Sequence, residues 1–211
     1  MRIIAIRHGE TEWNALGREQ GQLDSALTAR GLQQAEAIAG RLRRVSFSAL
    51  YSSDLGRALH TAEIVARATG ARIEVDAALR ERHTGIFQGM TNAQMAGQYP
   101  SEYSAYRLDP YAYQVPGGES GQQRTERSVR LMNALADRHA DETIVAITHG
   151  GFLIGFFEHV LALSPGNAWR FKRQNASFNV FVRADGAWSL ETWNDTSHLD
   201  ALGSLDEPPS L

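Results

Sequence analysis

The chain has 211 residues, 43% hydrophobic and 21% charged, with a formal net charge of -3, which is ordinary for one globular domain. The slightly acidic balance, with no block of Lys and Arg, argues against nucleic-acid binding, and the absence of cysteine excludes disulfides and thiolate chemistry. The longest apolar stretch, 150–163, is interrupted by Glu158 and His159 and is too short to span a bilayer, so we expect a cytoplasmic protein.

The first half of the chain alternates short apolar runs with helical patterns. The run Ile3 to Ile6 is β-branched and predicts a buried strand, which Arg7 and His8 follow directly. Thr28 is suited to cap a helix. The expected apolar stripe of that helix is Leu32, Ala35, Ile38, Ala39 and Leu42.

The same alternation continues with a strand over 49–51 and a helix from about Asp54 that closes at Gly70. Residues 72–75 alternate as a further strand would. The stretch 80–120 then breaks the pattern, because it is rich in Gly, Pro and aromatic residues. An irregular or short-helical excursion of this length inside a compact domain is usually functional.

Regular patterns return in the last third of the chain. A helical period runs from Gly121 to His139, and residues 143–147 form the most strand-like run of the sequence. An apolar helix follows, and 177–182 and 188–193 predict an antiparallel pair that turns at Asp185-Gly186.

These elements predict an α/β fold, a three-layer α/β/α sandwich with a mixed, mostly parallel central sheet. We expect a single catalytic domain over residues 1–200 and a flexible tail over 201–211, which contains Pro208 and Pro209. No oligomeric state is indicated.

Three predicted strand ends carry polar groups: Arg7-His8, the segment that leads to Arg57, and Thr148-His149. Taken singly, such histidines and arginines are more often structural or solvated. The carboxyl ends of neighbouring parallel strands meet at one edge of an α/β sheet, where ligands bind. We therefore expect these side chains to converge.

An ordered set of motifs strengthens this expectation and covers about residues 1–200. It consists of Arg7-His8-Gly9-Glu10-Thr11-Glu12-Trp13-Asn14, Gln20-Gly21, Tyr51 to Ala62, Leu79-Arg80-Glu81, Pro116-Gly117-Gly118-Glu119-Ser120 and Thr148-His149-Gly150-Gly151. In order and spacing, this set resembles the histidine phosphatase superfamily, which contains the cofactor-dependent phosphoglycerate mutases and many small phosphomonoesterases.

The resemblance implies that His8 is the nucleophile and that Arg7, Arg57 and His149 surround the phosphoryl group. A histidine must be neutral to attack phosphorus, so one ring nitrogen needs a free lone pair while the other donates to a fixed acceptor. Positive charge on the surrounding groups neutralises the phosphoryl oxygens. It also lowers the pKa of the nucleophile.

Glu81 matches the acid/base position of the family, which protonates the leaving group and then deprotonates the attacking water. The alternative for Glu81 is an ion pair with Arg80 or Arg82. Further substrate-binding residues implied by the motifs are Asn14, Gln20, Gly21, Arg82, His83 and Gly150. Among these, Arg82 is the candidate for gripping a second anionic group, such as a carboxylate.

The resulting prediction is a metal-independent phosphomonoesterase that hydrolyses a small phosphorylated metabolite through phosphohistidine, without a cofactor. His8, Glu81 and His149 are a conceivable zinc set, but two arginines in the same site would repel a cation. Two alternatives remain open: a cofactor-dependent phosphoglycerate mutase, if the site excludes water, and a non-catalytic phosphoester-binding module. Gly85 to Met90 carries Phe87 and Gln88 where the family often has Trp and Glu, which puts the familiar substrates in doubt.

Overall fold

A six-stranded mixed sheet forms the centre of the protein, in a computed structural model that describes residues 1–164 and 170–202. The strand order is β3-β2-β4-β1-β5-β6. The pairs among β3, β2, β4 and β1 are parallel, and β5 and β6 run antiparallel at one edge. The strands are β1 (Arg2–Arg7), β2 (Ala49–Ser52), β3 (Ile73–Val75), β4 (Thr143–Thr148), β5 (Phe178–Ala184) and β6 (Ala187–Asp195).

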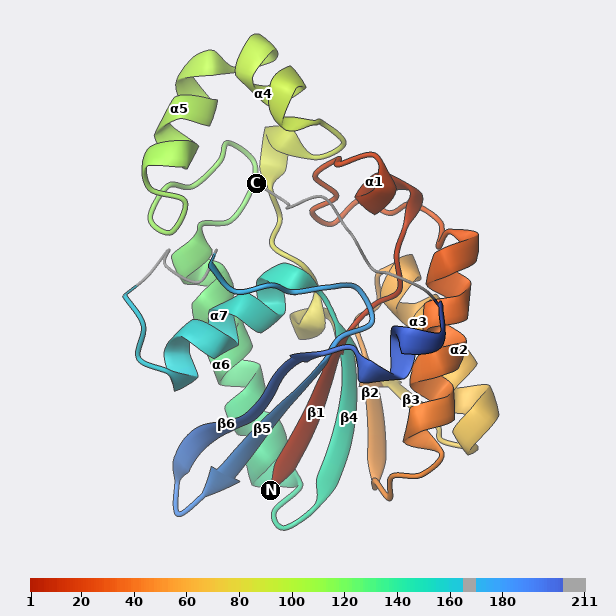
Figure 1. Cartoon of the computed structure of the whole chain (residues 1–211). Helices are drawn as coiled ribbons and strands as arrows, with labels where there is room; N and C mark the ends of the chain where they lie inside the picture. Colours follow the sequence, from red (N-terminus) through yellow and green to blue (C-terminus); the bar gives the residue numbers. More distant parts are fainter. Residues whose placement is uncertain (165–169, 203–211) are drawn as a thin grey trace.

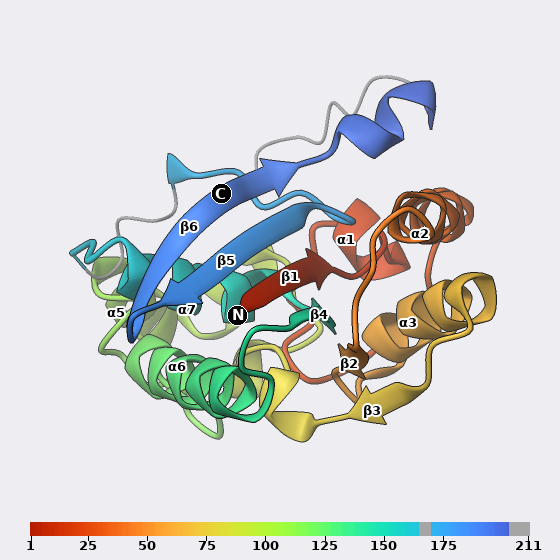
Figure 2. The same ribbon diagram turned by 90° about the horizontal axis from the view of Figure 1, so that it is seen from below.

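Helices cover both faces of this sheet, as Figure 2 shows from below. One face packs against α2 (Ala29–Leu42) and α3 (Gly56–Thr69), and the other packs against α6 (Gly121–Arg138) and α7 (Gly150–Val160). The three-layer α/β sandwich with a mostly parallel sheet is therefore confirmed.

The central strands read as continuous apolar runs because both of their faces are buried. In β1, Ile4 and Ile6 join the core under α2 and α3, whereas Ile3 and Ala5 join the core under α6 and α7. The period of two along a strand produces this division.

The excursion over 80–120 holds two short helices, α4 (Asn92–Gln98) and α5 (Pro100–Leu108), and the 3-10 turns Ala77–Leu79 and Gly85–Phe87 lie in or just before it. It packs around its own small cluster of buried side chains, namely Phe87, Met95 and Val115. Figure 1 places α4 and α5 at the same end of the molecule as the carboxyl ends of the parallel strands.

Most predicted boundaries are correct to within two residues, and the departures have local causes. The Asp185-Gly186 turn has positive φ angles of 50° and 78°, as a tight hairpin requires. Leu32, which we expected in the apolar stripe of α2, is 38% exposed and is not part of the buried face of this helix. The helix expected from about Asp54 begins at Gly56, and the Asp54 side chain forms an ion pair with Arg80.

Two further segments differ from expectation. A short helix, α1 (Glu12–Ala15), follows the Arg-His segment and carries a capping box formed by Thr11 and Asn14. Of the predicted tail 201–211, residues 201 and 202 end the 3-10 segment Ser197–Leu202, and residues 203–211 lie outside the described part of the chain.

Candidate active site

The carboxyl ends of β1 and β4 bring His8 and His149 together. The His8 backbone N–H donates to the Thr148 carbonyl at 3.0 Å, and the centroids of the two imidazole rings are 5.1 Å apart. Because β2 lies on the other side of β4, Arg57 at the start of α3 reaches the same point. The expected convergence of the three strand ends is therefore present.

The His8 ring has the tautomer that a nucleophile needs. Its Nδ1 lies 2.7 Å from the Gly9 carbonyl, which can only accept, so Nδ1 carries the proton. Nε2 then keeps its lone pair, toward which Arg57 Nε donates at 3.3 Å. Burial, followed by the charges of Arg57 and Arg7, holds the pKa of His8 well below its ordinary value.

His149 is fully buried at the N-terminus of α7. Neither of its ring nitrogens has a hydrogen-bond partner among the described residues. Burial, followed by Arg57, His8 and Arg7, lowers the pKa of His149 as well. A neutral His149 presents one N–H and one lone pair to whatever lies beside His8.

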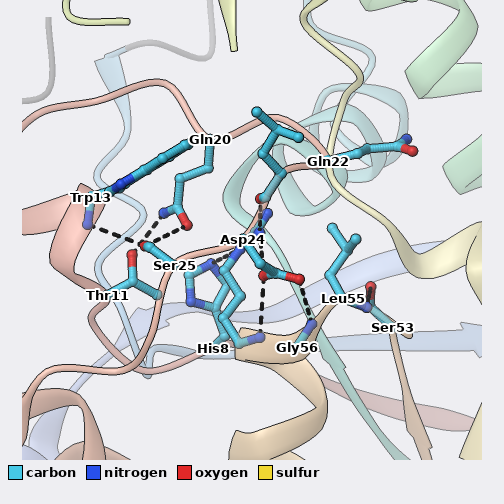
Figure 3. A network of polar contacts seen from close by, with 12 residues as sticks. His8, Thr11, Trp13, Gln20, Gln22, Asp24, Ser25, Ser53, Leu55 and Gly56 are labelled. Atoms are coloured by element: carbon cyan, nitrogen blue, oxygen red, sulfur yellow. Dashed lines mark hydrogen bonds and ion pairs between the residues drawn. The ribbon is translucent and has the colours of Figure 1, made fainter. Parts of the chain in front are cut away.

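The Arg57 guanidinium is held in place by the loop over residues 21–24. Its Nη2 donates to the Gly21 carbonyl at 2.8 Å, and its Nη1 donates to the Leu23 carbonyl at 2.7 Å and to Asp24 at 2.8 Å. The Asp24 carboxylate also accepts from the Gly56 backbone N–H at 2.6 Å, as Figure 3 shows.

Glu81 is oriented by two backbone donors. The N–H groups of Arg82 and Gly151 donate to its two carboxylate oxygens at 2.7 and 2.8 Å. Arg80 pairs with Asp54, so the alternative in which Glu81 is tied up by Arg80 is not realised. The Glu81 carboxylate therefore stands at the start of α7, one residue from Gly150.

Asn14 and Gln20, expected to contact the phosphate, both have partners within the loop. The Asn14 side-chain oxygen accepts from the Thr11 backbone and from Asn175 Nδ2, at 3.2 and 3.1 Å. Gln20 donates to the Thr11 hydroxyl at 2.8 Å and accepts from Ser25 (Figure 3).

Gly21 has a positive φ of 53°, and a Cβ there would lie 2.4 Å from Gln88 Oε1. The position therefore requires glycine. Its carbonyl is one of the groups that hold Arg57.

The geometry corrects the expectation that Arg82 grips a second anionic group. Its guanidinium is buried and donates to three backbone carbonyls, those of Pro110, Tyr113 and Glu119, at 2.8 to 3.0 Å. Arg82 thus anchors the end of the excursion. Because the Arg82 guanidinium binds these carbonyls, the ion pair between Arg82 and Glu81 that the sequence left open is not formed.

His83 and Gly150 have different surroundings. The His83 backbone N–H donates to Glu119, and its ring Nδ1 accepts from the Gly85 N–H, so His83 fixes the same loop as Arg82 does. Gly150 lies against arginine side chains: a Cβ there would be 3.4 Å from Arg7 Nε.

Three supporting residues were not singled out from the sequence. Asp24 holds Arg57, as described. Arg127 donates to the carbonyls of residues 78, 80 and 81, which braces the segment that carries Glu81. Asn175 donates to the His8 carbonyl at 3.1 Å. The role of Arg127 depends on tertiary packing alone, so no local sequence pattern indicates it.

Within the described residues, no group of three His, Cys, Asp or Glu side chains is placed to hold a metal ion. No helix in the described part of the chain is long and apolar enough to cross a membrane.

Comparisons with known proteins identify the family of this chain. A family model for the histidine phosphatase superfamily (branch 1) matches residues 3–196. The chain is 39% identical over 206 residues to a metal-independent phosphoserine phosphatase of Arabidopsis thaliana, covering 96% of this chain and 85% of that protein. It is 34% identical to a probable phosphoglycerate mutase, GpmB, of Shigella boydii, with 98% of each chain covered.

Among solved structures, a mycobacterial glucosyl-3-phosphoglycerate phosphatase superimposes with a TM-score of 0.81 at 34% identity, covering 92% of this chain and 99% of the other. The family model matches nearly the whole chain, residues 3–196. The chain belongs to the histidine phosphatase superfamily.

Proposed function

We propose that this protein is a phosphomonoesterase that hydrolyses a small phosphorylated metabolite through a phosphohistidine at His8. The observation that carries the proposal is the state of the His8 ring: Nδ1 is fixed by the Gly9 carbonyl and Nε2 faces the Arg57 guanidinium. A neutral imidazole with its lone pair in a cationic pocket is what attack on a phosphate ester needs.

In the first step, the lone pair of His8 Nε2 attacks phosphorus, an N–P bond forms and the ester P–O bond breaks. The departing oxygen takes a proton from the Glu81 carboxyl. Arg7, Arg57 and the N-terminus of α7 neutralise the charge of the phosphoryl oxygens. Neutral His149 adds a hydrogen bond.

In the second step, water attacks the phosphorus atom and the Glu81 carboxylate takes a proton from it. The N–P bond breaks, its electrons return to His8 Nε2, and inorganic phosphate leaves. Glu81 therefore acts first as acid and then as base, which its fixed orientation by Arg82 and Gly151 supports.

The names of the relatives support a small-molecule substrate. One relative is a phosphoserine phosphatase, and another is a phosphatase of a glucosylated phosphoglycerate. A mutase is the second candidate, because a relative of equal length is a probable phosphoglycerate mutase. A cytoplasmic location stays a prediction.

The first test is phosphate release from p-nitrophenyl phosphate in the presence of EDTA, with wild type, His8→Ala and His60→Ala. His60 is exposed on α3 and serves as the matched control. The proposal expects turnover that survives EDTA, persists in His60→Ala and is lost in His8→Ala. It also expects 32P to be trapped on the wild type after an alkaline quench, because the N–P bond of phosphohistidine is stable in alkali and is hydrolysed in acid.

Loss of turnover with EDTA would contradict metal independence. No release by wild type, together with phosphoryl exchange between phosphoglycerates, would establish the mutase instead. Phosphate binding without a trapped phosphoenzyme or exchange would favour a binding module.

A further inference from the structure

The peptide group between Glu81 and Arg82 is held at both of its ends. Its N–H, which belongs to Arg82, donates to Glu81 Oε1 at 2.7 Å. Its carbonyl oxygen, which belongs to Glu81, accepts from Arg127 Nη2 at 3.3 Å and from Gln22 Nε2 at 3.1 Å. Because a peptide group is planar and rigid, the donors that hold the oxygen also fix the direction of the N–H. The orientation of the Glu81 carboxylate therefore depends on these two side chains.

Arg127 also fixes the chain that leads to this peptide group. Its Nη1 donates to the carbonyls of Ala78 and Arg80 at 2.9 and 2.8 Å, so one guanidinium binds three carbonyls of the segment that ends at Glu81. Arg127 lies on α6, and its side chain is 20% exposed. The donors of a guanidinium have a fixed, planar geometry, so the position of α6 sets the path of this segment.

The fourth partner of Arg127 is the Glu119 carboxylate, at the end of the excursion. The same carboxylate oxygen accepts from the His83 backbone N–H at 3.0 Å, and the Glu119 N–H donates to the His83 carbonyl at 2.8 Å. The Glu119 carbonyl accepts from Arg82 Nε at 2.9 Å. The two ends of the excursion are therefore joined to each other directly after Glu81, and Arg127 is bound to this junction.

The two segments that enter and leave the excursion pack backbone against backbone at this junction. A Cβ at Gly118 would lie 2.4 Å from the His83 carbonyl oxygen, and a Cβ at Gly85 would lie 2.1 Å from the Pro116 carbonyl oxygen. The Ile86 N–H donates to the same Pro116 carbonyl at 3.0 Å. The base of the excursion is thus closed by direct backbone contact.

We propose that Arg127 and Glu119 are positioning residues for the acid/base step. Their ion pair holds the peptide group of Glu81 in the orientation that directs the carboxylate, and it makes this orientation depend on the closed base of the excursion. The inference rests on the proposed function, in which Glu81 transfers protons. Both residues act through Glu81 and not on the phosphoryl group.

A displaced carboxylate has different consequences in the two proposed steps. In the first step the departing oxygen needs a proton, and this need is large for an alkoxide and small for p-nitrophenolate. In the second step the attacking water needs a base, whichever ester supplied the phosphoryl group. Loss of the Arg127 guanidinium should therefore make the first step depend on the leaving group and slow the second step with every ester. A residue that only stabilised the fold would lower all rates by one factor.

The test divides the kcat/KM of an alkyl ester by that of p-nitrophenyl phosphate, where the alkyl ester is the best substrate among phosphoserine, 3-phosphoglycerate and glycerol phosphate. Because kcat/KM covers the steps up to departure of the leaving group, this ratio cancels any loss of folded protein. The variants are Arg127→Gln, Glu119→Ala and the two combined, with Glu81→Gln as the reference for loss of proton transfer. Arg183→Gln is the matched control, since the Arg183 side chain is 25% exposed and pairs with Asp137 at the other end of α6.

Arg127→Gln and Glu119→Ala should each lower the ratio by about 10- to 100-fold, and Arg183→Gln should not change it. The double variant should lie within about threefold of the more impaired single variant, because both side chains act through one peptide group. With p-nitrophenyl phosphate, kcat should fall more than kcat/KM in Arg127→Gln. A larger fraction of this variant than of wild type should carry 32P after an alkaline quench during turnover, because hydrolysis of phosphohistidine has become slow.

Equal losses on both esters in Arg127→Gln, without accumulation of the phosphoenzyme, would overturn the positioning role. Losses that multiply in the double variant would show that Glu119 acts independently of Arg127, which would overturn the pair. If Glu81→Gln itself showed no dependence on the leaving group, Glu81 would not be the acid, and the proposed mechanism would fail instead. Wild type that hydrolyses neither kind of ester would refute the proposed function.

Discussion

The Asp24 carboxylate connects two features that the site needs at once. One of its oxygens lies 2.8 Å from Arg57 Nη1, and the other accepts from the Gly56 backbone N–H at 2.6 Å. Asp24 therefore caps α3, because the N-cap residue of this helix, Leu55, has no side-chain acceptor. The same carboxylate holds the Arg57 guanidinium, which faces His8. The start of α3 and the position of the arginine beside His8 therefore both depend on Asp24.

We predict that Asp24→Asn lowers kcat/KM by about 10- to 100-fold, because a charge-assisted hydrogen bond contributes about 1.5–3 kcal/mol. The loss should appear with every phosphate ester, since we propose that Arg57 acts on the phosphoryl group. Asp137→Asn is the control, because Asp137 forms an exposed ion pair with Arg183. Steady-state kinetics of both variants measure the effect, and equal rates in the two would show that Arg57 does not depend on Asp24.

A second prediction concerns Gly151. A Cβ at this position would lie 1.9 Å from Glu81 Oε1, so Gly151→Ala forces the carboxylate out of its place. We expect kcat for alkyl phosphate esters to fall by about 10²–10⁴-fold, as for loss of a general acid. The loss should be smaller with p-nitrophenyl phosphate, because its leaving group needs less protonation.

Gly40→Ala provides the matched control, since no atom lies within 4 Å of the added Cβ in α2. Its activity should be unchanged, and its unfolding free energy should rise by about 0.5–1 kcal/mol. A Gly151→Ala protein with wild-type kcat on alkyl esters would mean that Glu81 is not the acid.

The positions of His8 and His149 at one edge of the sheet could be predicted from the sequence. His8 and His149 both follow buried β-branched runs, and apolar runs of this kind predict neighbouring strands whose carboxyl ends coincide. From the chemistry of attack on phosphorus, the sequence analysis required a fixed acceptor for one ring nitrogen of His8, and the structure identifies it as the carbonyl of the adjacent residue, Gly9.

The partners of side chains that bind residues far away in the sequence could not be predicted. Asp24 caps a helix that begins 32 residues later, and its acceptor role depends on how the loop folds back. Arg82 looked like an anion ligand from its place beside Glu81. Its guanidinium instead meets carbonyls up to 37 residues away. Local patterns specify strands and caps, whereas the partner of a long flexible side chain is chosen by tertiary contacts.

The third prediction follows from that assignment of Arg82. Arg82→Gln removes three partly buried hydrogen bonds to backbone carbonyls, so we expect a loss of about 2–4 kcal/mol in unfolding free energy. The ratio of kcat/KM for 3-phosphoglycerate to that for glycerol phosphate should not change. Urea unfolding and kinetics test both parts, with Arg107→Gln, at an exposed position of α5, as control. A change in the ratio without a change in stability would restore Arg82 as a substrate ligand.

The fourth prediction concerns the acid limb of activity. His8 must be neutral to attack, and burial together with Arg57 and Arg7 places its pKa well below the ordinary value of 6.5. As pH falls through 6.5, His8 should therefore stay neutral, and kcat/KM should decline only at lower pH. Arg57→Gln removes the larger of the two charges that lower this pKa, so its His8 should protonate at higher pH than in wild type.

Histidine-selective NMR titration of the free enzyme measures this directly, independently of the ionisation of the substrate. Protonation of His8 at or above pH 6.5 in wild type would contradict the prediction. So would an unshifted titration in Arg57→Gln.

The last prediction concerns stability and lies away from the active site. The His198 ring packs edge-on against Phe178, with centroids 4.8 Å apart. Burial, followed by the charge of Arg41, lowers the pKa of His198 to about 4. The unfolded chain thus binds a proton that the folded chain refuses, and stability present above pH 6.5 is lost as pH falls toward 4.

His198→Phe keeps the aromatic packing and removes the titrating group. The unfolding free energy of this variant should therefore fall less steeply with pH than that of wild type between pH 6.5 and 4. The difference in slope is at most about 1.4 kcal/mol per pH unit, and is smaller to the extent that water reaches the ring. Urea unfolding at a series of pH values measures it. Equal slopes would show that His198 binds its proton equally well in the folded and the unfolded protein. The kinetics at neutral pH should match wild type, because the residue lies outside the phosphoryl site.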